Sequence, residues 1–575
     1  MRKIIGYLKP YAWCFVAAFI LIAIRVFGEL SLPNLMSMIV DEGIAKSDIL
    51  YIWRTGGIML LLALVSTLAI VLMDYFGAKI SAGFARDLRK SVFHKVQSFS
   101  GAEFDKFGAS SLITRTINDI TQLQNFLTMF TRTIMMCPLF MLGSIFLAFT
   151  KNATMAAIFV SLVPFLLAII TVITKLTIPL STVIQKRVDK INLIIREKLT
   201  GIRVIRAFNK ERYEEKRFDE ANRDLTEIMI KLQKISSALM PLMSTVLNCG
   251  TIAVVWFGAK RISQGVLQVG DLMAVLQYIM HVMFSLMMLS MIFIMYPRAA
   301  ASAERVAEIL NAVPVILDAD ETKDEETSGA SVEFKNVSFY YENSDEAAIK
   351  DVSFVAKAGE TTAIIGSTGS GKTTLINLIP RLYDAKEGQV LVGGVDVRDL
   401  SQHSLREKIG FVPQKAVLFS GSINSNIRWG KNEATDEEVR IAAEIAQSTD
   451  FINKKEDSFN AHIAQGGTNV SGGQKQRLAI ARAIVKKPEI YIFDDSFSAL
   501  DFKTDANLRA ALKKHTDKAT VIIVAQRVST IMHADNILVM DEGELVGQGT
   551  HKELFNSCEV YREIVLSQLA KEEMA

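Results

Sequence analysis

The chain has 575 residues, so at roughly 150 residues per domain it is too long for a single small module. Half of the residues are apolar, 22% are charged and the mean hydropathy is +0.26, which excludes a disordered or fibrous chain and favours a membrane protein. The net charge of +3 is near zero for this length, so no nucleic-acid partner is expected. The cysteines at residues 14, 137, 249 and 558 are too scattered to predict a disulfide framework or a zinc site.

Six apolar stretches are long enough to cross a bilayer, whose core of about 30 Å requires roughly 20 apolar residues per helix. They are centred near Leu21, Val65, Phe140, Val163, Val246 and Met287. The first stretch is longer than a signal-peptide core and lacks a cleavage motif, so we expect it to remain in the mature protein. The sequence therefore predicts an all-α transmembrane domain with six helices over residues 1–312.

Basic residues near the ends of these stretches predict the orientation. Lys and Arg precede the first stretch and are frequent in residues 86–115 and 186–217. Because such residues favour the cytoplasmic side, we expect the N-terminus and the long connections to lie in the cytoplasm and the spans in the cytoplasmic membrane. The long connections lack proline and have helical apolar spacing, which predicts helices that continue beyond the bilayer and turn near 110–118 and 201–206. A solvated helical hairpin is the alternative.

A linker and a second domain follow the last span. Residues 318–326 are rich in acidic side chains and lead into Thr327-Ser328-Gly329, which predicts a linker over residues 313–331. Beyond it, short β-rich runs such as 361–365 and 490–493 alternate with helical segments. This alternation predicts an α/β domain of the P-loop type over residues 332–575.

A glycine-rich motif lies between a predicted strand, 361–365, and a predicted helix, 374–378. It reads Gly366, Ser367, Thr368, Gly369, Ser370, Gly371, Lys372, Thr373 and Thr374. The glycines allow backbone N–H groups to surround phosphates, and the helix N-terminus favours the anion. Lys372 can reach the β- and γ-phosphates, and Thr373 can bind Mg²⁺. Motif and context together predict binding of ATP with Mg²⁺.

A pair of carboxylates follows the predicted strand 490–493. Asp494 is predicted to hold Mg²⁺ through its water shell, and Asp495 to face the attacking water. An apolar run that ends in acidic residues usually marks only a strand that reaches solvent. The P-loop earlier in the chain is what makes the catalytic interpretation specific.

The run from Ser471 to Arg477, Ser-Gly-Gly-Gln-Lys-Gln-Arg, resembles the signature motif of ATP-binding cassette (ABC) proteins. Six spans ahead of one cassette resemble a half-transporter of the exporter type, and the resemblance covers nearly the whole chain. It implies further nucleotide-binding residues: Tyr341 stacking on adenine, Gln414 as the Q-loop residue that also contacts Mg²⁺, Ser471, Gly472, Gly473 and Gln474 as the signature, and Asp501 closing the D-loop that begins at Ser498. By itself, Tyr341 would be taken for a strand aromatic.

The resemblance also implies a dimer. In the family two cassettes dock head to tail, so that each ATP lies between the P-loop of one chain and the signature of the other. The start of a helix at Ser471 would supply the second phosphate-binding group of amides. The predicted turns near 110–118 and 201–206 resemble the coupling helices that transmit cassette movement to the spans.

Three positions depart from the family pattern. Asp495 stands where hydrolytically competent cassettes have Glu, and Gln526 stands where they have His; Val470 in place of Leu is a milder change. The shorter carboxylate should lie roughly 1.5 Å farther from the attacking water, and a displacement near 1 Å can cost about 100-fold in rate. Gln526 can donate a hydrogen bond to the γ-phosphate but cannot shuttle a proton. We therefore expect a heterodimer with a degenerate site on this chain; a slow homodimer is the alternative.

The substrate is less well specified. Residues 280–295 of the sixth span are rich in methionine, which suits a promiscuous apolar surface but also serves as packing or lipid-facing filler. Arg25 and Glu29 share one face of the first span and should face a wet cavity, in contact either with substrate or only with each other. The sequence favours export of amphiphilic small molecules of the multidrug type. A dedicated lipid or peptide exporter and an ATP-gated channel or regulator are alternatives, whereas a soluble cassette ATPase and an importer fit the six fused spans poorly.

Overall fold

The computed structural model describes residues 2–319, 321–327, 329–341 and 344–568. Contacts divide the chain into two compact units. The first comprises Met1–Gln97 and Ala109–Ala312, and the second comprises Ser98–Gly108 together with Val313–Ala575. A short piece of the N-terminal half, 98–108, therefore belongs with the C-terminal unit.

The first unit is helical in all of its described residues that have regular structure. Six of its helical stretches are long and apolar enough to cross a membrane: Ile4–Ile44, Ile49–Gln97, Ala109–Lys151, Ala153–Thr200, Glu211–Ser263 and Val269–Leu289. Each contains one of the six predicted centres, so the prediction of six spans is confirmed.

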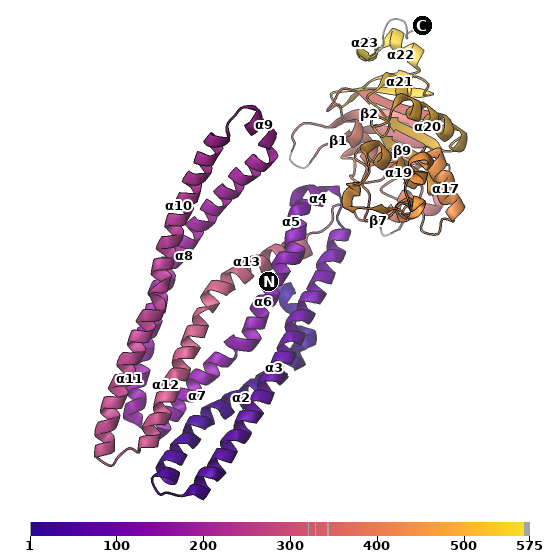
Figure 1. The fold of residues 1–575 in the computed structure, drawn as a ribbon. Helices are drawn as coiled ribbons and strands as arrows, with labels where there is room; N and C mark the ends of the chain where they lie inside the picture. Colours follow the sequence, from indigo (N-terminus) through magenta and orange to yellow (C-terminus); the bar gives the residue numbers. More distant parts are fainter. Residues whose placement is uncertain (1, 320, 328, 342–343, 569–575) are drawn as a thin grey trace. The chain divides into compact units, whose positions relative to one another are not determined.

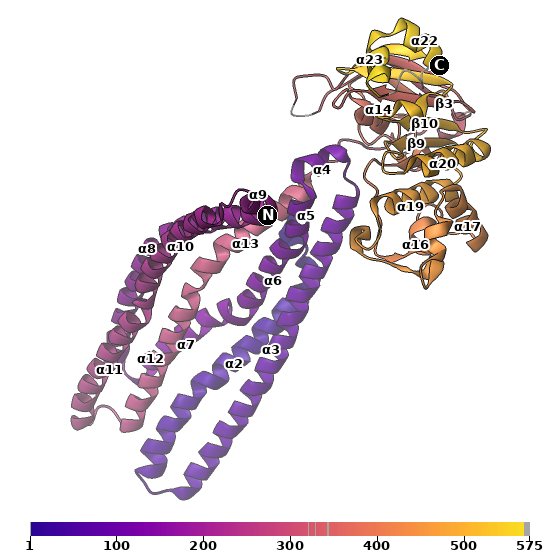
Figure 2. The same ribbon diagram turned by 45° about the horizontal axis from the view of Figure 1, so that its top comes forward.

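The stretch Ala109–Lys151 consists of consecutive helices joined by the π-helical turns η3 and η4, and the π-helical turn η2 ends the first stretch. In chain order the elements are α1 (Arg2–Gly6), η1 (Lys9–Tyr11), α2 (Ala12–Met38), η2 (Ile39–Ile44), α3 (Ile49–Gln97), α5 (Ala109–Thr114), η3 (Arg115–Asp119), α6 (Ile120–Met129), η4 (Phe130–Ile134), α7 (Met136–Lys151), α8 (Ala153–Thr200), α9 (Ile202–Ala207), α10 (Glu211–Ser237), α11 (Leu239–Ser263), α12 (Val269–Ser290) and α13 (Ile292–Asn311). Figures 1 and 2 show α8 and α10 side by side and joined by α9 at one end.

The two predicted turns have different outcomes. The second is confirmed, because α8 ends at Thr200 and the short α9 begins at Ile202. The first prediction, 110–118, was wrong: this stretch is helical, and Asp119 at its end accepts hydrogen bonds from Arg305 at 2.8 and 2.5 Å. The turn lies about ten residues earlier, at α4 (Gly101–Phe107).

Local sequence signals explain where α4 begins and ends. Ser100 and Glu103 form a capping box at its start, in which the Glu103 carboxylate accepts from the Ser100 amide at 2.8 Å. Gly108 ends the helix with a φ of 71°, a conformation that glycine adopts at little cost. The predicted turn was misplaced because helical apolar spacing continues through residues 110–118, whereas the capping box and Gly108 lie before that stretch.

The second unit combines helices with three sheets. Its strands are β1 (Val332–Phe339), β2 (Ile349–Ala356), β3 (Thr361–Gly366), β4 (Glu387–Val392), β5 (Val395–Asp396), β6 (Ile409–Val412), β7 (Gly421–Ser422), β8 (His462–Ile463), β9 (Ile490–Asp494), β10 (Thr520–Val524), β11 (Asn536–Asp541) and β12 (Glu544–Gly549). The largest sheet has the order β12-β11-β3-β10-β9-β6 and is parallel except for β12. The predicted α/β architecture is confirmed.

The helices of this unit, apart from α4, are α14 (Lys372–Leu378), α15 (Gln402–Glu407), α16 (Ile423–Arg428), α17 (Asp436–Ile445), α18 (Thr449–Asn453), α19 (Gly472–Val485), α20 (Phe502–His515), α21 (Val528–Ile531), α22 (His551–Ser557) and α23 (Glu559–Gln568), with 3₁₀ turns η5 (Asp324–Glu326), η6 (Ser458–Asn460) and η7 (Gln465–Gly467). Alternate residues of the central strands are buried in two different apolar clusters, as Ile492 and Phe493 of β9 illustrate. Because both faces of the sheet are covered, its central strands β9 and β10 are buried at every residue.

The acidic stretch after the first unit is bound to this domain. Asp324 accepts hydrogen bonds from the amide and hydroxyl of Ser401 at 2.9 and 2.7 Å. Asp318 accepts from the amide and side chain of Gln402, each at 3.0 Å. These carboxylates lie at the N-terminus of α15, where the helix dipole favours negative charge.

Candidate functional site

The parallel strands bring the predicted site residues to one edge of the sheet. β10 lies between β3 and β9, and its Val524 pairs with both Ile364 and Asp494 (Figure 2). β6 lies on the other side of β9. The chain segments that leave the carboxyl ends of these four strands carry the P-loop, Gln526, the Asp494–Asp495 pair and Gln414. In open α/β sheets this edge is where ligands bind.

The P-loop has the backbone that the motif predicts. Ser367, Thr368, Gly369 and Ser370 connect β3 to α14, whose N-cap Gly371 has a φ of 91°. A Cβ atom at Gly371 would lie 2.6 Å from the carbonyl oxygen of Ala348, so only glycine fits there. The Nζ atom of Lys372 donates to the carbonyl oxygens of Gly366 and Ser367 at 2.9 and 2.6 Å. The ammonium group therefore lies inside the loop.

A hydroxyl and a carboxylate, both possible ligands of Mg²⁺, lie close together next to the P-loop. The Thr373 hydroxyl lies 3.2 and 3.1 Å from the two carboxylate oxygens of Asp494. Burial raises the pKa of both Asp494 and Asp495 and lowers that of Lys372, so all three groups lack the solvation that would stabilise their charges. A hydroxyl and a carboxylate suit Mg²⁺, which takes oxygen ligands and keeps sites for substrate phosphates. Within the described ranges no group of three or more His, Cys, Asp or Glu side chains is placed to hold a metal ion by itself.

Asp495 is held by two side-chain amides. Its Oδ2 accepts from Gln526 Nε2 at 3.0 Å and from Gln414 Nε2 at 3.4 Å. Its φ of 44° is in the left-handed region, which Asp and Asn occupy more readily than other non-glycine residues. The two predicted catalytic residues are thus in direct contact, and the predicted Q-loop residue, Gln414, contacts the same carboxylate.

Tyr341 reaches the helix that follows the P-loop. Its hydroxyl is 3.0 Å from the Thr374 hydroxyl, and its ring packs edge to face on Phe339 and Tyr383 with centroid distances of 5.0 and 5.7 Å. The side chain remains 38% exposed. A partly exposed ring beside α14 is consistent with the predicted contact to adenine.

The signature residues begin a helix, as predicted. Ser471 is the N-cap of α19 and forms a capping box with Gln474, whose amide donates to Ser471 Oγ at 3.3 Å. Gly472 and Gly473 supply the first amides of the helix, which have no partner within it. Ser471 and Gln474 bond to each other, and within the described residues neither side chain bonds to the P-loop of the same chain.

The D-loop links the signature to Asp495. A Cβ atom on Gly473 would lie 3.1 Å from the Ala499 carbonyl oxygen, and the Ser498 hydroxyl donates to the Asp495 carbonyl oxygen at 2.9 Å. Asp501 caps α20 by accepting from the amide and hydroxyl of Thr504 at 2.9 and 2.8 Å. Its carboxylate is engaged in this cap.

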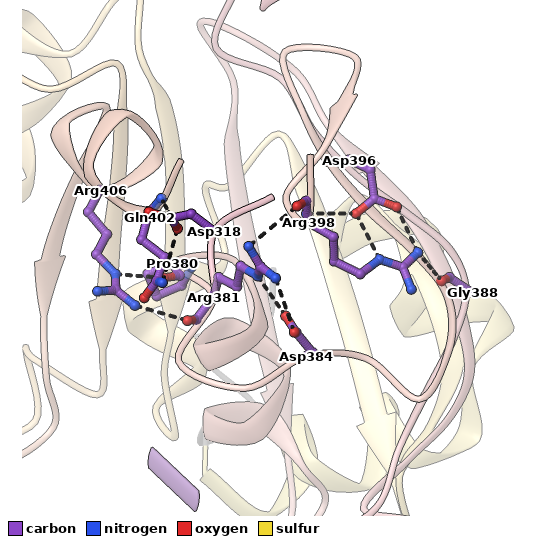
Figure 3. A network of polar contacts seen from close by, with 9 residues as sticks. All are labelled: Asp318, Pro380, Arg381, Asp384, Gly388, Asp396, Arg398, Gln402 and Arg406. Atoms are coloured by element: carbon purple, nitrogen blue, oxygen red, sulfur yellow. Dashed lines mark hydrogen bonds and ion pairs between the residues drawn. The ribbon is translucent and has the colours of Figure 1, made fainter. Parts of the chain in front are cut away.

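Sequence analysis missed Tyr383, which connects the Tyr341 region to α4. Its hydroxyl donates to the Asp105 carboxylate at 2.8 Å, and the amide of Gly101 donates to the Leu382 carbonyl oxygen at 3.4 Å. Figure 3 shows how this segment is held: the buried Arg381 donates to Asp384 at 2.8 Å, and Arg406 donates to the carbonyl oxygens of Pro380 and Arg381. α4 therefore docks on a segment fixed by two arginines.

Gln568, in the last described turn of the chain, was also missed. Its side chain bonds the backbone of Gln526 and Val528 at 2.8 and 2.9 Å. No local motif marks either residue; each is identified only by its contact in the folded domain.

Comparison with known proteins adds the family. Residues 15–287 match the ABC transporter transmembrane region, and residues 349–498 match the ABC transporter family. The chain is 38% identical to the uncharacterized ABC transporter ATP-binding protein YfiB of Bacillus subtilis, over 100% of this chain and 99% of that protein. It is 31% identical to the ATP-dependent lipid A-core flippase of Syntrophus aciditrophicus, over 84% of this chain and 80% of the flippase.

A solved structure of a bacterial Atm1-family ABC exporter with ATP bound has the same fold. Its TM-score is 0.78 at 25% identity, and the match covers 97% of this chain and 98% of that one. Six candidate spans, a P-loop, a capped signature helix and these similarities agree with one another. The chain belongs to the ABC transporters, as an exporter half-transporter with its transmembrane domain fused to an ATP-binding domain.

Proposed function

We propose that this chain is one half of a heterodimeric ABC exporter, and that it binds ATP firmly at its own P-loop but hydrolyses it slowly. The observation that carries the proposal is the pairing of Asp495 with Gln526, 3.0 Å apart, at the two positions where competent cassettes have Glu and His. The Asp495 side chain is shorter than Glu by one methylene, and the Gln526 side chain carries no titratable proton. Neither residue is well suited to activate water.

The other site residues retain their binding roles in this proposal. Lys372 and the amides of residues 366–371 hold the phosphates, Thr373, Asp494 and Gln414 hold Mg²⁺, and Tyr341 stacks on adenine. When bound, Mg²⁺ neutralises phosphate charge and orients the γ-phosphate. Residues 471–474 and Asp501 complete the ATP site of the second subunit, which performs most of the hydrolysis.

We assign residues 1–312 to the membrane domain, 313–331 to the linker and 332–575 to the nucleotide-binding domain. The N-terminus and the nucleotide-binding domain lie in the cytoplasm, because Lys and Arg are concentrated at that end of the spans. ABC exporters act as dimers, and ATP closes the two cassettes and opens the membrane cavity outward.

Amphiphilic small molecules are the proposed cargo. The methionine-rich α12 supports this choice, as does the Arg25–Glu29 ion pair of 2.9 Å, whose side chains remain 20 and 27% exposed. A paired charge inside a span suits a wet cavity that accepts polar head groups. A lipid is the second candidate, because one relative is named a lipid A-core flippase.

Nucleotide trapping tests the division of labour. The chain is purified in lipid with the product of the adjacent reading frame, loaded with MgATP, and each subunit is assayed for retained ATP. We expect this chain to retain ATP while the partner turns it over. Brisk ATPase activity from this chain alone, lost on Asp495→Asn, would refute the proposal. Inside-out vesicles separate the two cargo classes when the uptake of a cationic dye is compared with the uptake of a fluorescent lipid.

A further inference from the structure

The C-terminal helix α23 ends beside the loop that carries Gln526. The side-chain amide of Gln568 donates to the carbonyl oxygen of Gln526 at 2.8 Å, and its Oε1 accepts from the amide of Val528 at 2.9 Å. One planar carboxamide therefore holds the backbone on both sides of Arg527. Because each bond uses the opposite end of the amide, only a side chain with both a donor and an acceptor can make the pair.

Buried anchors bring Gln568 to this position. Tyr561 and Val565 are 0 and 1% exposed, and Gln568 follows Val565 by three residues, so all three share one helix face. The Tyr561 hydroxyl is 2.7 Å from Nδ1 of His551 on α22. The rotation of α23 is thus set by packing, and that packing directs Gln568 at the loop.

The opposite side of the same loop faces the hydrolytic residues. Gln526 Nε2 donates to Asp495 Oδ2 at 3.0 Å, and the Arg527 guanidinium donates to the Ser498 carbonyl oxygen at 3.1 Å. A backbone shift at Gln526 would move its carboxamide relative to a bound γ-phosphate. Displacements near 1 Å at reacting groups can cost about 100-fold in rate.

We propose that Gln568 is a positioning residue of the ATP site: it fixes the backbone of Gln526 so that the carboxamide faces Asp495 and the γ-phosphate. The inference rests on the proposed function, in which Gln526 acts at the γ-phosphate, and adds the C-terminal helix to the site. α23 lies outside both matched family regions, 15–287 and 349–498.

A double-mutant cycle tests the assignment in the full-length chain within the lipid-embedded transporter. Gln568→Ala, Gln526→Ala and the double variant are compared for MgATP affinity and for the single-turnover hydrolysis rate of ATP held on this chain. We expect Gln568→Ala to slow hydrolysis about fivefold, as expected for loss of a net hydrogen bond, and to change affinity less than about twofold. In the Gln526→Ala background it should cause no further slowing.

Ser567→Ala is the matched control, because among the residues that the structure describes the Ser567 hydroxyl donates to the Ile564 carbonyl oxygen of its own helix. It should hydrolyse ATP at the wild-type rate. Additive slowing in the double variant, equal slowing in Ser567→Ala, or an unchanged rate in Gln568→Ala would each overturn the assignment.

Hydrogen exchange supplies a second measurement. Gln568→Ala should expose the Val528 amide to faster exchange while the amides of residues 562–565 remain protected. Unchanged exchange at Val528, or lost protection across α23, would contradict the positioning role. A fast absolute rate in the wild-type chain would instead contradict the slow-site proposal, whereas the ratio of variant to wild type reports only on Gln568.

Discussion

Gln526 donates a hydrogen bond of 3.0 Å to the Asp495 carboxylate. Replacing both residues with those of competent cassettes should raise the rate of ATP hydrolysis. Glu adds a methylene that brings the carboxylate toward the attacking water, and His can carry a proton. We expect the double variant Asp495→Glu, Gln526→His to hydrolyse the ATP on this chain about 10- to 100-fold faster in single turnover. Asp495→Asn, the control, should remain slow. An unchanged rate in the double variant would show that other features limit hydrolysis.

Two adjacent threonines offer a matched pair at the same scale. Thr373 bonds the Asp494 carboxylate at 3.1 Å, whereas Thr374 bonds the Tyr341 hydroxyl at 3.0 Å. Thr373→Val keeps the side-chain shape but removes the oxygen that we propose as a Mg²⁺ ligand, so ATP trapping should require about tenfold more Mg²⁺. Thr374→Val should leave the Mg²⁺ requirement unchanged. A Mg²⁺ titration of ATP retention, with EDTA as the zero point, measures both; equal shifts would contradict the assigned metal role.

At the scale of elements, two helices begin with the same kind of capping box, but only one of them belongs to the proposed ATP site. Ser471 caps α19 and Thr435 caps α17, each through a capping box. Ser471→Ala and Thr435→Ala should each cost about 1 kcal/mol of helix stability. Only Ser471→Ala should reduce ATP turnover of the assembled transporter, by about tenfold, because in the dimer that we propose the start of α19 would face the partner's nucleotide. Thermal denaturation and ATPase assays separate the two effects, and a similar ATPase loss in both variants would indicate damage to folding alone.

Some of these elements could be predicted from the sequence and others could not. The P-loop and the capped signature helix were predictable because glycines and a Ser-x-x-Gln cap act within a few residues. α4 was displaced in the prediction because helical spacing continues past its true boundaries. Tyr383 and Gln568 could not be found, since their contacts depend on how α4 and α23 pack on the domain. The order β3-β10-β9, which brings Gln526 beside Asp495, is likewise a property of the folded sheet.

At the scale of the whole molecule, α4 is a segment of the second unit that is inserted in the chain between two helices of the first. It belongs to the second unit by contact, yet it is covalently continuous with α3 and α5 of the first. Its bond to the ATP-binding domain runs from Asp105 to Tyr383, whose ring lies against Tyr341 at 5.7 Å. If Tyr341 stacks on adenine, as we propose, its contact with Tyr383 provides a route from the nucleotide to α4.

Tyr383→Phe tests this connection, because it removes the hydroxyl that donates to Asp105 at 2.8 Å and keeps the ring. Burial and the bond to Asp105 raise the pKa of Tyr383, so the hydroxyl remains protonated as the donor. We expect the ratio of transport to ATP hydrolysis to fall about two- to fivefold, in line with one lost hydrogen bond. Asp105→Ala should have the same effect and add nothing to Tyr383→Phe, whereas Asp105→Asn keeps an acceptor oxygen and should stay near wild type. If transport and hydrolysis decline together in all three variants, α4 affects the stability of the domain and not its coupling to the spans.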